Sequence, residues 1–366
     1  MLRRMFPLCA LLGCLTLAAC SSEATVEVPT QTQAAAETES QEETQVLETE
    51  PETEPEETHE GEKKSYLSGL WQDEDKVNRR PVAVMLNNLE KALPQTSINR
   101  AEIIYEAPVE GMITRLMGIY EDYDDLDKIG SVRSARTYFV FWSEQWDSIY
   151  AHYGQCDYAN IYLDQIDNLN GVLGIGNTVY YRTSDRKAPH NAYTSAEGLE
   201  AGIEQMGYRT DHEADYDRGV FLFADEPGDV TLEDGMNAEY VYPGYSQNDA
   251  YFEYDPETGH YLRYEYGNAQ IDDLDGEQVY TDNIIIQYCD WEYYYETTPY
   301  LWINIWSEGE GYYITQGKAV PITWEGGTEY EPTTYYDMDG NEIELNPGKT
   351  WVCTVLLNNQ DDTVIE

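Results

Sequence analysis

Arginine residues are unevenly distributed along this acidic sequence, and their positions indicate a site for an anion. The formal net charge is −49, yet one part of the chain concentrates cations at Arg115, Arg133, Arg136, Arg182, Arg186 and Lys187. Guanidinium groups that lie close together repel one another unless an anion separates them. A phosphate or carboxylate held by bidentate hydrogen bonds would supply that anion.

The segment from Gly130 to Arg136 is the centre of this predicted site. If Ser131 caps a helix, Arg133 and Arg136 lie about one turn apart and can face one way. The amide groups at the N-terminus of that helix could contact the same anion. The anion could instead be internal, because Glu106 and Glu110 could neutralise the arginines, and the sequence favours neither alternative.

A polar loop from Asp185 to Asn191 carries a titratable histidine ahead of a predicted helix. His190 could act as a general base, a ligand or a hydrogen-bonding partner, and loops of this kind often carry function. His152 ends a predicted strand and could face the same cleft. The predicted binding residues are Arg115, Arg133, Ser134, Arg136, His190 and Asn191. The alternative is acid–base catalysis, for which the predicted residues are Glu106, Glu110, His152 and Asp185, with His190 assisting.

Signatures of several enzyme classes and metal sites are missing from the sequence. It contains no G-x-S-x-G, H-E-x-x-H or P-loop pattern. Asp337 to Asn341 resembles a calcium loop, but its glycine stands in the fourth place rather than the sixth, which favours a hairpin turn. Cys156 with His190 and Asn191 lacks a spacing that supports a thiol nucleophile. We therefore predict no metal and no cofactor.

The N-terminus has the features of a lipoprotein signal. Arg3 and Arg4 precede an apolar run, Leu8 to Leu17, which is too short to span a bilayer as a mature helix. Leu17-Ala18-Ala19-Cys20 then matches a lipobox. We predict that residues 1–19 are a signal peptide and that lipid on Cys20 anchors the chain at the extracytoplasmic face of the cell membrane. A plain signal peptide with a chance cysteine is the alternative.

Residues 20–70 are predicted to hold the lipidated cysteine and a disordered acidic linker. Ser21 to Ser65 contains 14 Glu and 2 Lys, a net charge of −12, and no Phe, Trp or Tyr. Such a segment cannot bury enough apolar surface to offset the entropy lost on folding, and its like charges extend it. We expect a stalk that lifts the folded region off the lipid surface.

The net charge limits the classes of binding partner, and the cysteine content limits the disulfide bonds that can form. The strong negative charge argues against nucleic acid and anionic membrane as partners, and we expect a cell-wall polymer or an envelope protein. Six cysteines are present, of which Cys9 and Cys14 leave with the signal. The odd set of Cys156, Cys289 and Cys353 excludes a fully paired framework, and a Cys289–Cys353 bridge stays open.

The first folded half, residues 71–228, alternates strand and helix patterns. Apolar runs predict strands at residues 81–87, 101–106, 113–120, 148–152 and 219–223, and periodicity predicts helices at 133–146 and 157–166. Thr194-Ser195-Ala196-Glu197 is a capping-box pattern that opens a further helix, and Gly207 ends it. This alternation predicts an α/β-type domain with a mixed sheet and packed helices.

The second half, residues 229–366, is β-rich. Aromatic and β-branched residues alternate with polar ones, and turn signals recur at residues 255–259, 275–276 and 339–341. These features predict antiparallel hairpins. The fold class expected for the whole folded region is α+β, with layered sheets and helices forming a sandwich.

Several of these motifs together resemble the YerB lipoprotein family. They are residues 80–88 (RPVAVMLNN), 94–96 (PQT), 101–106 (AEIIYE), 109–115 (VEGMITR), 130–136 (GSVRSAR), 188–191 (APHN), 337–341 (DMDGN) and 346–351 (NPGKTW). Met112 departs from an expected second glycine, and Ser131 from an expected proline. The resemblance implies a Gram-positive-type lipoprotein with two domains of unknown function and an α+β fold. It implies no established reaction.

The leading functional hypothesis is a non-enzymatic, envelope-anchored binding or accessory protein that recognises an anionic ligand. A cell-wall polymer, a nucleotide-like molecule or a peptide carboxylate would fit. An envelope hydrolase or transferase that uses Glu106 or Glu110 with His190 is the alternative. A protein–protein scaffold that uses the aromatic β-rich half is a third hypothesis.

Overall fold

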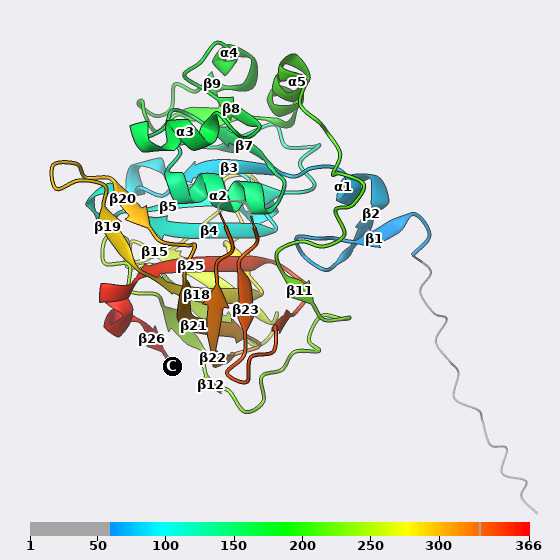
Figure 1. The fold of residues 1–366 in the computed structure, drawn as a ribbon, viewed down its shortest axis with the longest axis vertical. Coiled ribbons are helices and arrows are strands. Elements are labelled where there is room, and N and C mark those ends of the chain that lie inside the picture. The colour runs from blue at the N-terminus through cyan, green and yellow to red at the C-terminus, as the bar shows by residue number, and fades with distance from the viewer. Residues whose placement is uncertain (1–58, 329–330) are drawn as a thin grey trace, which may run out of the picture. The chain divides into compact units, whose positions relative to one another are not determined.

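A large mixed sheet of eleven strands joins the two halves of the sequence (Figure 1). The computed structural model describes residues 59–328 and 331–366. The strand order is β12 (Met236–Asn237), β22 (Lys318–Glu325), β21 (Glu308–Thr315), β18 (Asn283–Cys289), β25 (Thr350–Leu356), β4 (Ile103–Pro108), β5 (Thr114–Tyr120), β3 (Val82–Asn87), β7 (Ile149–His152) and β8 (Asn168–Asn170), with β23 (Thr334–Tyr336) beside β22.

The strand β25 lies between the two halves and pairs with both of them. It runs parallel to β18, where Cys353 lies opposite Ile286, and parallel to β4, where Trp351 lies opposite Ile104. All seven residues of β25 are buried. A strand buried on both faces is typical of a parallel sheet with covered faces, and its near-continuous apolar sequence follows from that position.

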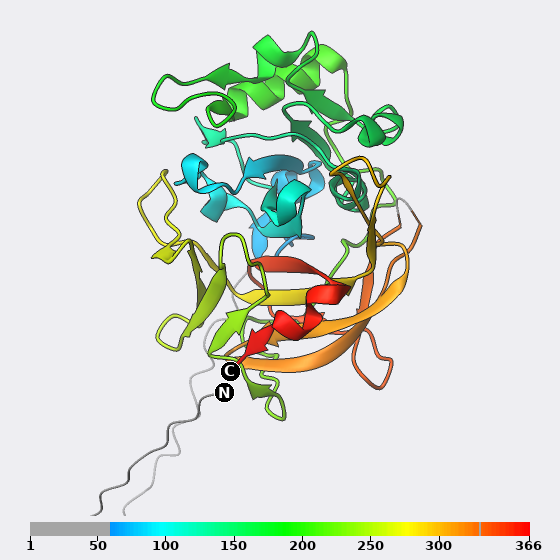
Figure 2. The ribbon, with the colours of Figure 1, turned by 90° about the vertical axis from the view of Figure 1, so that its left-hand side faces the viewer.

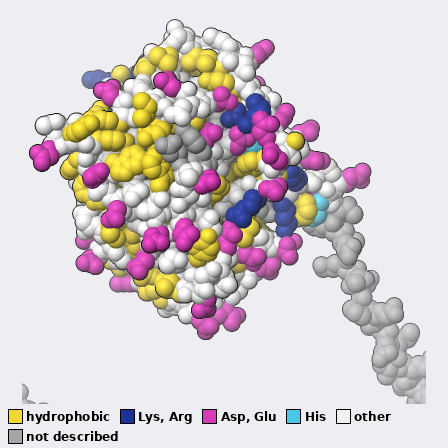
Figure 3. Space-filling model, in the orientation of Figure 1, with side chains coloured by type: hydrophobic (Ala, Val, Ile, Leu, Met, Phe, Trp, Pro, Cys, Tyr) yellow, Lys and Arg dark blue, Asp and Glu magenta, His cyan; other side chains and the backbone are white. Residues whose placement is uncertain are grey.

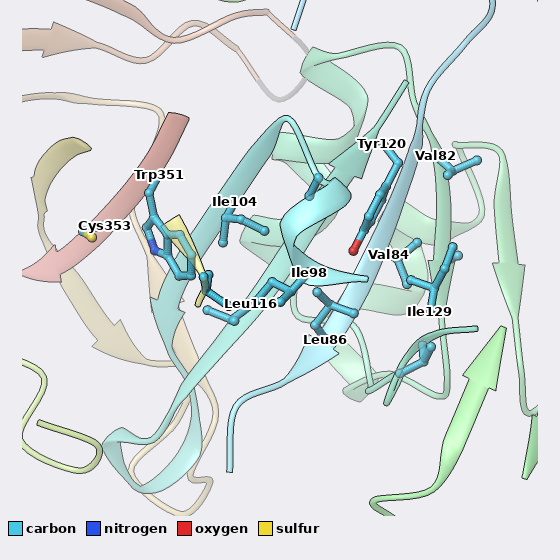
Figure 4. Packing of buried hydrophobic residues seen from close by; sticks show 14 of the residues in the cluster. Val82, Val84, Leu86, Ile98, Ile104, Leu116, Tyr120, Ile129, Trp351 and Cys353 are labelled. Carbon is cyan, nitrogen blue, oxygen red and sulfur yellow. The ribbon is translucent and has the colours of Figure 1, made fainter. Parts of the chain in front are cut away.

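A second sheet of six strands covers part of one face of the large sheet. Its order is β16 (Asn268–Ala269), β15 (His260–Glu265), β14 (Tyr251–Asp255), β13 (Tyr240–Tyr242) and β26 (Val364–Ile365), with β17 (Tyr280–Thr281) beside β15. Phe252 of this sheet packs edge-on against Trp351, with ring centroids 5.5 Å apart. On this side of the large sheet, Ile104, Leu116 and Trp351 from three strands form one apolar layer (Figure 4).

Helices cover both faces of the large sheet near its β7–β8 edge. Helix α5 (Ala196–Met206) and the short α4 (Gly176–Val179) share the core that contains Ile104 and Trp351. Helix α2 (Thr137–Gln145) packs on the opposite face with α3 (Asn160–Leu163). Trp142 of α2 stacks on Tyr105 of β4, with ring centroids 4.9 Å apart. The molecule is therefore layered, as Figures 1 and 2 show from two sides.

The remaining elements are short and lie around these layers. They are β1 (Glu62–Lys64), β2 (Trp71–Asp73), α1 (Glu74–Asn78), β6 (Ile129–Gly130), β9 (Tyr181–Arg182), β10 (Ala192–Thr194), β11 (Leu222–Phe223), β19 (Trp291–Tyr293), β20 (Leu301–Ile303) and β24 (Glu344–Leu345). The β19–β20 hairpin carries exposed aromatic side chains such as Tyr293 and Tyr295. Figure 3 shows hydrophobic side chains gathered over this hairpin, while carboxylates are scattered over the rest of that face.

The predicted strands of the first half are present, and no end is shifted by more than three residues. The predicted turn at residues 255–259 joins β14 to β15 in an antiparallel hairpin. Asp337 to Asn341 forms the predicted turn, in which Gly340 has a φ of 84° and its N–H lies 3.1 Å from the carbonyl oxygen of Asp337. The predicted α+β layered class is confirmed.

The prediction of a helix from residue 133 is wrong, because α2 begins only at Thr137. The preceding segment is extended, and its N–H groups bond to distant carbonyls: Val132 to Ala192, Arg133 to Met85 and Ala135 to Gly154. Arg133 and Arg136 are therefore not one helical turn apart, and no helix N-terminus lies at Ser131.

Two other helix predictions need correction. Residues 157–166 form a 3-10 turn at Asp157–Ala159 and the four-residue α3 rather than one long helix. The N-cap of α5 is Ser195, whose side chain accepts a hydrogen bond from the N–H of Gly198 at 3.2 Å. Thr194 is not the cap: it is the last residue of β10, and its hydroxyl donates to the Val179 carbonyl, 2.8 Å away. Gly207 ends α5 in the left-handed conformation, as predicted.

Cys156, Cys289 and Cys353 are buried free thiols, so the Cys289–Cys353 bridge does not form. Cys289 lies opposite Leu356 rather than Cys353 in the β18–β25 ladder. The predicted signal peptide, Cys20 and the linker up to residue 58 lie outside the described residues. Among the described residues, no helix is long and apolar enough to cross a membrane. The predicted division between residues 228 and 229 stays a prediction, although both halves contribute to the large sheet.

Candidate functional site

Three arginines meet at one end of the large sheet, on the side of α2. Arg115 is the second residue of β5, where it lies opposite Asn87 of β3 and Ala107 of β4. Its side chain shares a face with that of Met117, because alternate residues of a strand point the same way. The extended segment before α2 brings Arg133 and Arg136 to this place. We call Arg115, Arg133, Arg136 and Glu110 the arginine cluster.

Arg136 is held in a bidentate ion pair by Glu110. Its Nη2 lies 2.6 Å from Glu110 Oε2, and its Nε donates to Oε1. Its Nη1 donates to the carbonyl oxygen of Ala135 at 2.6 Å, and Tyr300 lies 5.3 Å from the guanidinium carbon. Burial by itself would raise the pKa of Glu110, but the hydrogen bond to Arg136 and the attraction of Arg136 and Arg115 together outweigh it, so the pKa is lowered. Glu110 is therefore a carboxylate committed to Arg136.

Arg115 is buried, and no carboxylate of the described residues forms an ion pair with it. Its Nη1 donates to the carbonyl oxygen of Ser134 at 2.7 Å. Burial, together with repulsion from Arg136 and Arg133, lowers the pKa of Arg115 to about 9. A neutral carbonyl oxygen does not neutralise the guanidinium charge as a carboxylate would, so Arg115 adds an uncompensated positive charge to the cluster.

Arg133 has no hydrogen-bond or ion-pair partner for its guanidinium group among the described residues. Its Nε is buried, and the side chain as a whole is partly exposed. Burial and repulsion from Arg136 lower the pKa of Arg133, and attraction to Glu110 offsets only part of this. The arginine cluster thus sets three guanidinium groups against one carboxylate, with Arg133 as its open member.

His190 lies at the edge of the arginine cluster. Its Nδ1 is 2.9 Å from Asn87 Nδ2, and the amide group can only donate in this contact, so Nδ1 accepts. The neutral ring then carries its proton on Nε2. Burial, followed by repulsion from Arg133, Lys91 and Arg186, lowers the pKa of His190. The ring is therefore a neutral donor at pH 7.

Ser134 and Asn191, the other two predicted binding residues, form hydrogen bonds that hold the backbone in place. Ser134 presents its carbonyl to Arg115, and its hydroxyl donates to the carbonyl oxygen of Tyr153 at 2.9 Å. Asn191 accepts a hydrogen bond from Arg182 Nη1 at 2.8 Å and donates to the Thr183 carbonyl at 2.7 Å. The Asn191 side chain therefore stabilises the loop from Asp185 to Asn191, and its oxygen and nitrogen atoms both have hydrogen-bond partners.

His152 and Asp185, two of the predicted catalytic residues, do not belong to the arginine cluster. His152 is fully buried, with Nδ1 2.8 Å from the carbonyl oxygen of Gly154 and Nε2 3.1 Å from Asn168 Oδ1. Burial lowers the pKa of His152. Asp185 is exposed at the surface, 3.6 Å from Arg186 Nε. The structure therefore does not place His152 and His190 together in one open cleft.

Glu106 lies on the opposite face of the sheet, where it pairs with an arginine that sequence reasoning missed. Both Glu106 and Arg263 are fully buried, with 2.6 Å between Oε2 and Nη2. Glu106 also accepts hydrogen bonds from Thr114 Oγ1 at 2.7 Å and Trp351 Nε1 at 3.1 Å. Phe252 and Trp351 lie 4.7 and 4.5 Å from the Arg263 guanidinium carbon.

A signal for this pair was present in β15. In the sequence HYLRYE, Tyr261, Arg263 and Glu265 occupy alternate positions, so an inward Tyr261 requires the two charged residues to point inward as well. Asn88 and Asn248 donate toward the same carboxylates. We call Glu106, Arg263, Glu265, Asn88 and Asn248 the interior network.

The arrangement of the arginine cluster suits the binding of an anion. It offers the open guanidinium of Arg133 and the neutral imidazole of His190 beside a region of excess positive charge. The carboxylates nearest to it do not provide a free base, since Glu110 is paired and Glu106 is enclosed. Among the described residues, no group of three or more His, Cys, Asp and Glu side chains could hold a metal ion.

Comparison with known proteins places this architecture in a family. The family described as "Protein of unknown function (DUF3048) N-terminal domain" matches residues 67–209. The family of the corresponding C-terminal domain matches residues 240–352. "Putative lipoprotein YerB" of Bacillus subtilis (strain 168) is 31% identical over 294 residues, which cover 79% of this chain and 85% of the relative. The chain belongs to the YerB-like lipoprotein family.

The solved structure of a YerB-like protein supports the same conclusion at the level of the fold. The crystal structure of YerB protein from Bacillus subtilis matches with a TM-score of 0.73 and 30% identity. It covers 83% of this chain and 99% of that chain. The resemblance inferred from the motifs is thereby confirmed, and the YerB-like chain is a lipoprotein with two domains of unknown function.

Proposed function

We propose that this YerB-like chain is an extracytoplasmic, lipid-anchored binding or accessory protein of the cell envelope, and that its arginine cluster recognises an anionic group. The observation that carries the proposal is Arg133, a partly exposed guanidinium beside two buried arginines and without a partner in residues 59–328 and 331–366. Three cations and one carboxylate leave two positive charges to balance. A bound phosphate or carboxylate would provide the missing negative charge.

The location of the ligand follows from the predicted anchor. Lipid on Cys20 and an acidic linker would hold the folded region at the outer face of the membrane, in contact with the cell wall. The whole chain is strongly acidic, so a polyanion is repelled by most of its surface. We therefore expect a single anionic group of a wall polymer or a peptide carboxylate to enter the cluster, rather than an extended anionic chain.

Calorimetric titration with inorganic phosphate and with glycerol 1-phosphate tests this proposal. We expect both anions to bind the wild-type chain at low ionic strength and pH 7. In Arg133→Gln the dissociation constant should rise about 10- to 100-fold, since a hydrogen bond to a charged group contributes about 1.5–3 kcal/mol.

Arg218→Gln is the matched control, because Arg218 is an exposed arginine that pairs with Glu342 elsewhere on the surface. It should bind both anions as the wild type does. Absence of binding to the wild type would contradict the proposal, as would an equal loss of affinity in the two variants. Equal loss would mean that the anions respond only to net charge.

The hydrolase or transferase alternative receives less support from the geometry. Glu106 faces the other side of the sheet and is bonded to Arg263, and Glu110 is bonded to Arg136. A general base needs a lone pair within reach of the substrate proton. Glu106 is fully buried, out of reach of a substrate, and the lowered pKa of Glu110 makes it a weaker base than an ordinary glutamate.

A further inference from the structure

A cavity of about 380 Å³ lies between the chain segment that follows β3 and the β15–β16 hairpin. In Figure 2 these are the cyan segment and the neighbouring yellow loop, which also meet in a hydrogen bond from Asp273 N–H to the Gln95 carbonyl at 2.8 Å. Leu93, Pro94 and Ile271 supply apolar walls, and Tyr266 supplies an aromatic one. The volume is within the range of small-molecule sites, about 300–1,000 Å³.

Glu265 and Gln270 are buried side chains that line the cavity, and each carries an oxygen atom with no hydrogen-bond donor among the described residues. Glu265 is 1% exposed, and its Oε2 accepts a bond from Asn248 Nδ2 at 3.3 Å while Oε1 has no partner. Gln270 is 3% exposed, and its Oε1 also lacks a partner. Both side chains line the cavity. Leaving such an acceptor unsatisfied costs about 1–3 kcal/mol, and more when it is charged.

Hydrogen bonds fix the orientation of Gln270, so its oxygen cannot be exchanged for its nitrogen. Asn88 Nδ2 donates to Glu106 and to Thr114, so Asn88 Oδ1 must accept. Gln95 Nε2 donates to that oxygen at 3.0 Å, which leaves Gln95 Oε1 as an acceptor. Gln270 Nε2 donates to this atom at 3.1 Å. The remaining atom of the Gln270 amide is therefore an oxygen.

The charge of the interior network favours a cation at this place. Glu106 and Glu265 are balanced by the single guanidinium of Arg263, which donates to Glu106. One negative charge is therefore in excess. The exposed carboxylate of Glu90 stands at the rim of the same cavity and adds to the negative potential.

We propose that this cavity binds a small molecule with a primary ammonium group on a compact apolar body. A small shift of both side chains toward the cavity lets the ammonium donate to Glu265 Oε1 and Gln270 Oε1, which are otherwise buried. The apolar body lies against Leu93, Pro94 and Ile271. Three N–H donors on one nitrogen match two acceptor oxygens and leave a donor for water or Glu90. This site is distinct from the arginine cluster, and its ligand has the opposite charge.

The titration of Glu265 gives the site a pH dependence. Burial raises the pKa of Glu265 to about 7, with Glu106 adding to the effect and Arg263 opposing it. The other groups that face it are Asn248, Asn88 and the Tyr266 hydroxyl, with Glu90 at the rim. An ammonium ion binds the carboxylate form, so affinity should fall about tenfold per pH unit below pH 7.

Benzylamine and benzyl alcohol are a matched pair of probes for this proposal, since they differ in charge and share an apolar body. We expect benzylamine to bind the full chain at pH 8, detected by calorimetry and by a crystal structure of the complex, and benzyl alcohol to bind at least 10-fold more weakly. Glu265→Gln should weaken benzylamine binding at least 10-fold. Glu253→Gln, which alters an exposed carboxylate of β14, should not change it.

Ile271→Trp is a second variant that keeps the test decisive if Glu265→Gln fails to fold. Ile271 is 36% exposed at the cavity wall, so a larger side chain can fill the entrance without disturbing the core. It should abolish benzylamine binding. The proposal is overturned if benzylamine does not bind the wild type, if it binds Ile271→Trp unchanged, or if the crystal structure shows only water between Glu265 and Gln270.

Discussion

Glu106 and Glu110 are four residues apart, yet their surroundings differ in exposure and in charge balance. Glu106 is 0% exposed and bonds to Arg263, whereas the side chain of Glu110 is 22% exposed and bonds to Arg136. The interior network around Glu106 has one negative charge in excess, and the arginine cluster around Glu110 has two positive charges in excess. The face of the sheet on which a residue lies therefore decides which charges it meets.

Two adjacent asparagines mark the division between these regions. Asn87 bonds to His190 on the side of the arginine cluster, at 2.9 Å. Asn88 bonds to Thr114 Oγ1 on the side of the interior network, at 2.8 Å. Consecutive side chains of a strand point to opposite faces, so a single dipeptide at the end of β3 contacts both regions. Gln95 Nε2 joins them by donating to the Asn87 carbonyl and to Asn88 Oδ1.

The largest expected effect comes from breaking the buried pair. Arg263→Ala leaves Glu106 as an uncompensated buried carboxylate and should lower the free energy of unfolding by about 3–5 kcal/mol. Urea denaturation measures the change. The double variant Glu106→Gln/Arg263→Met should recover most of the loss, because it removes both charges. A double variant as unstable as the single one would show that the ion pair itself is not the cause.

The pH dependence of stability should reveal the excess negative charge of the interior network. The raised pKa of Glu265, about 7 against an ordinary 4.5, means that the folded chain binds more protons than the unfolded chain between these values. Stability should therefore fall as pH rises through this window, by up to about 1.4 kcal/mol per pH unit from this residue. The slope should become shallower in Glu265→Gln. An unchanged slope would mean that Glu265 titrates normally.

Arg136→Gln should have a smaller effect on stability than Arg263→Ala. It leaves Glu110 partly exposed, so water replaces some of the lost bonds, and we expect a loss of about 1–3 kcal/mol. The pKa of Glu110, now lowered by Arg136, should rise toward that of an ordinary glutamate or above. NMR titration of the carboxyl carbon measures this. A Glu110 pKa that does not move would show that Arg136 is not its main partner.

The smallest change in stability is expected for Arg133→Gln. Within the described part of the chain Arg133 has no partner to lose, and its removal relieves repulsion within the arginine cluster, so stability should change by less than about 0.5 kcal/mol. A loss of several kcal/mol would mean that Arg133 holds the fold together, and would remove the main support for an anion site. Thermal unfolding in the absence of phosphate distinguishes these outcomes.

The strands could be predicted because their signal is local. Residues 82–87 and 114–120 are continuous apolar or alternating runs with turn residues at their ends. The cap of α5 and its terminal Gly207 were also visible within a few residues. The register that places β25 between β18 and β4 depends on residues up to about 250 positions apart, and no short pattern contains that information.

The candidate site could be predicted only in part, because some of its signal is local and some depends on residues far apart in the sequence. The excess of arginine around residues 115–136 was visible, and the structure does bring Arg115, Arg133 and Arg136 together. Their assumed helical spacing was wrong, because N–H groups of residues 132–135 bond to Ala192, Met85 and Gly154 instead of to their own turn. The Glu106–Arg263 pair joins residues 157 positions apart, and only the alternation within β15 hinted at it.

The central place of β25 also has a consequence for the order of folding. Until residues 350–356 have left the ribosome, β4 and β18 each present an unpaired edge, and the core on both faces of the sheet is incomplete. Pairing across such a distance in the sequence is slow, because the entropy of closing a long loop must be lost first. The chain therefore cannot complete its fold early in synthesis. A product truncated before Thr350 would keep two unpaired strand edges, which are prone to aggregation, and would be open to proteases.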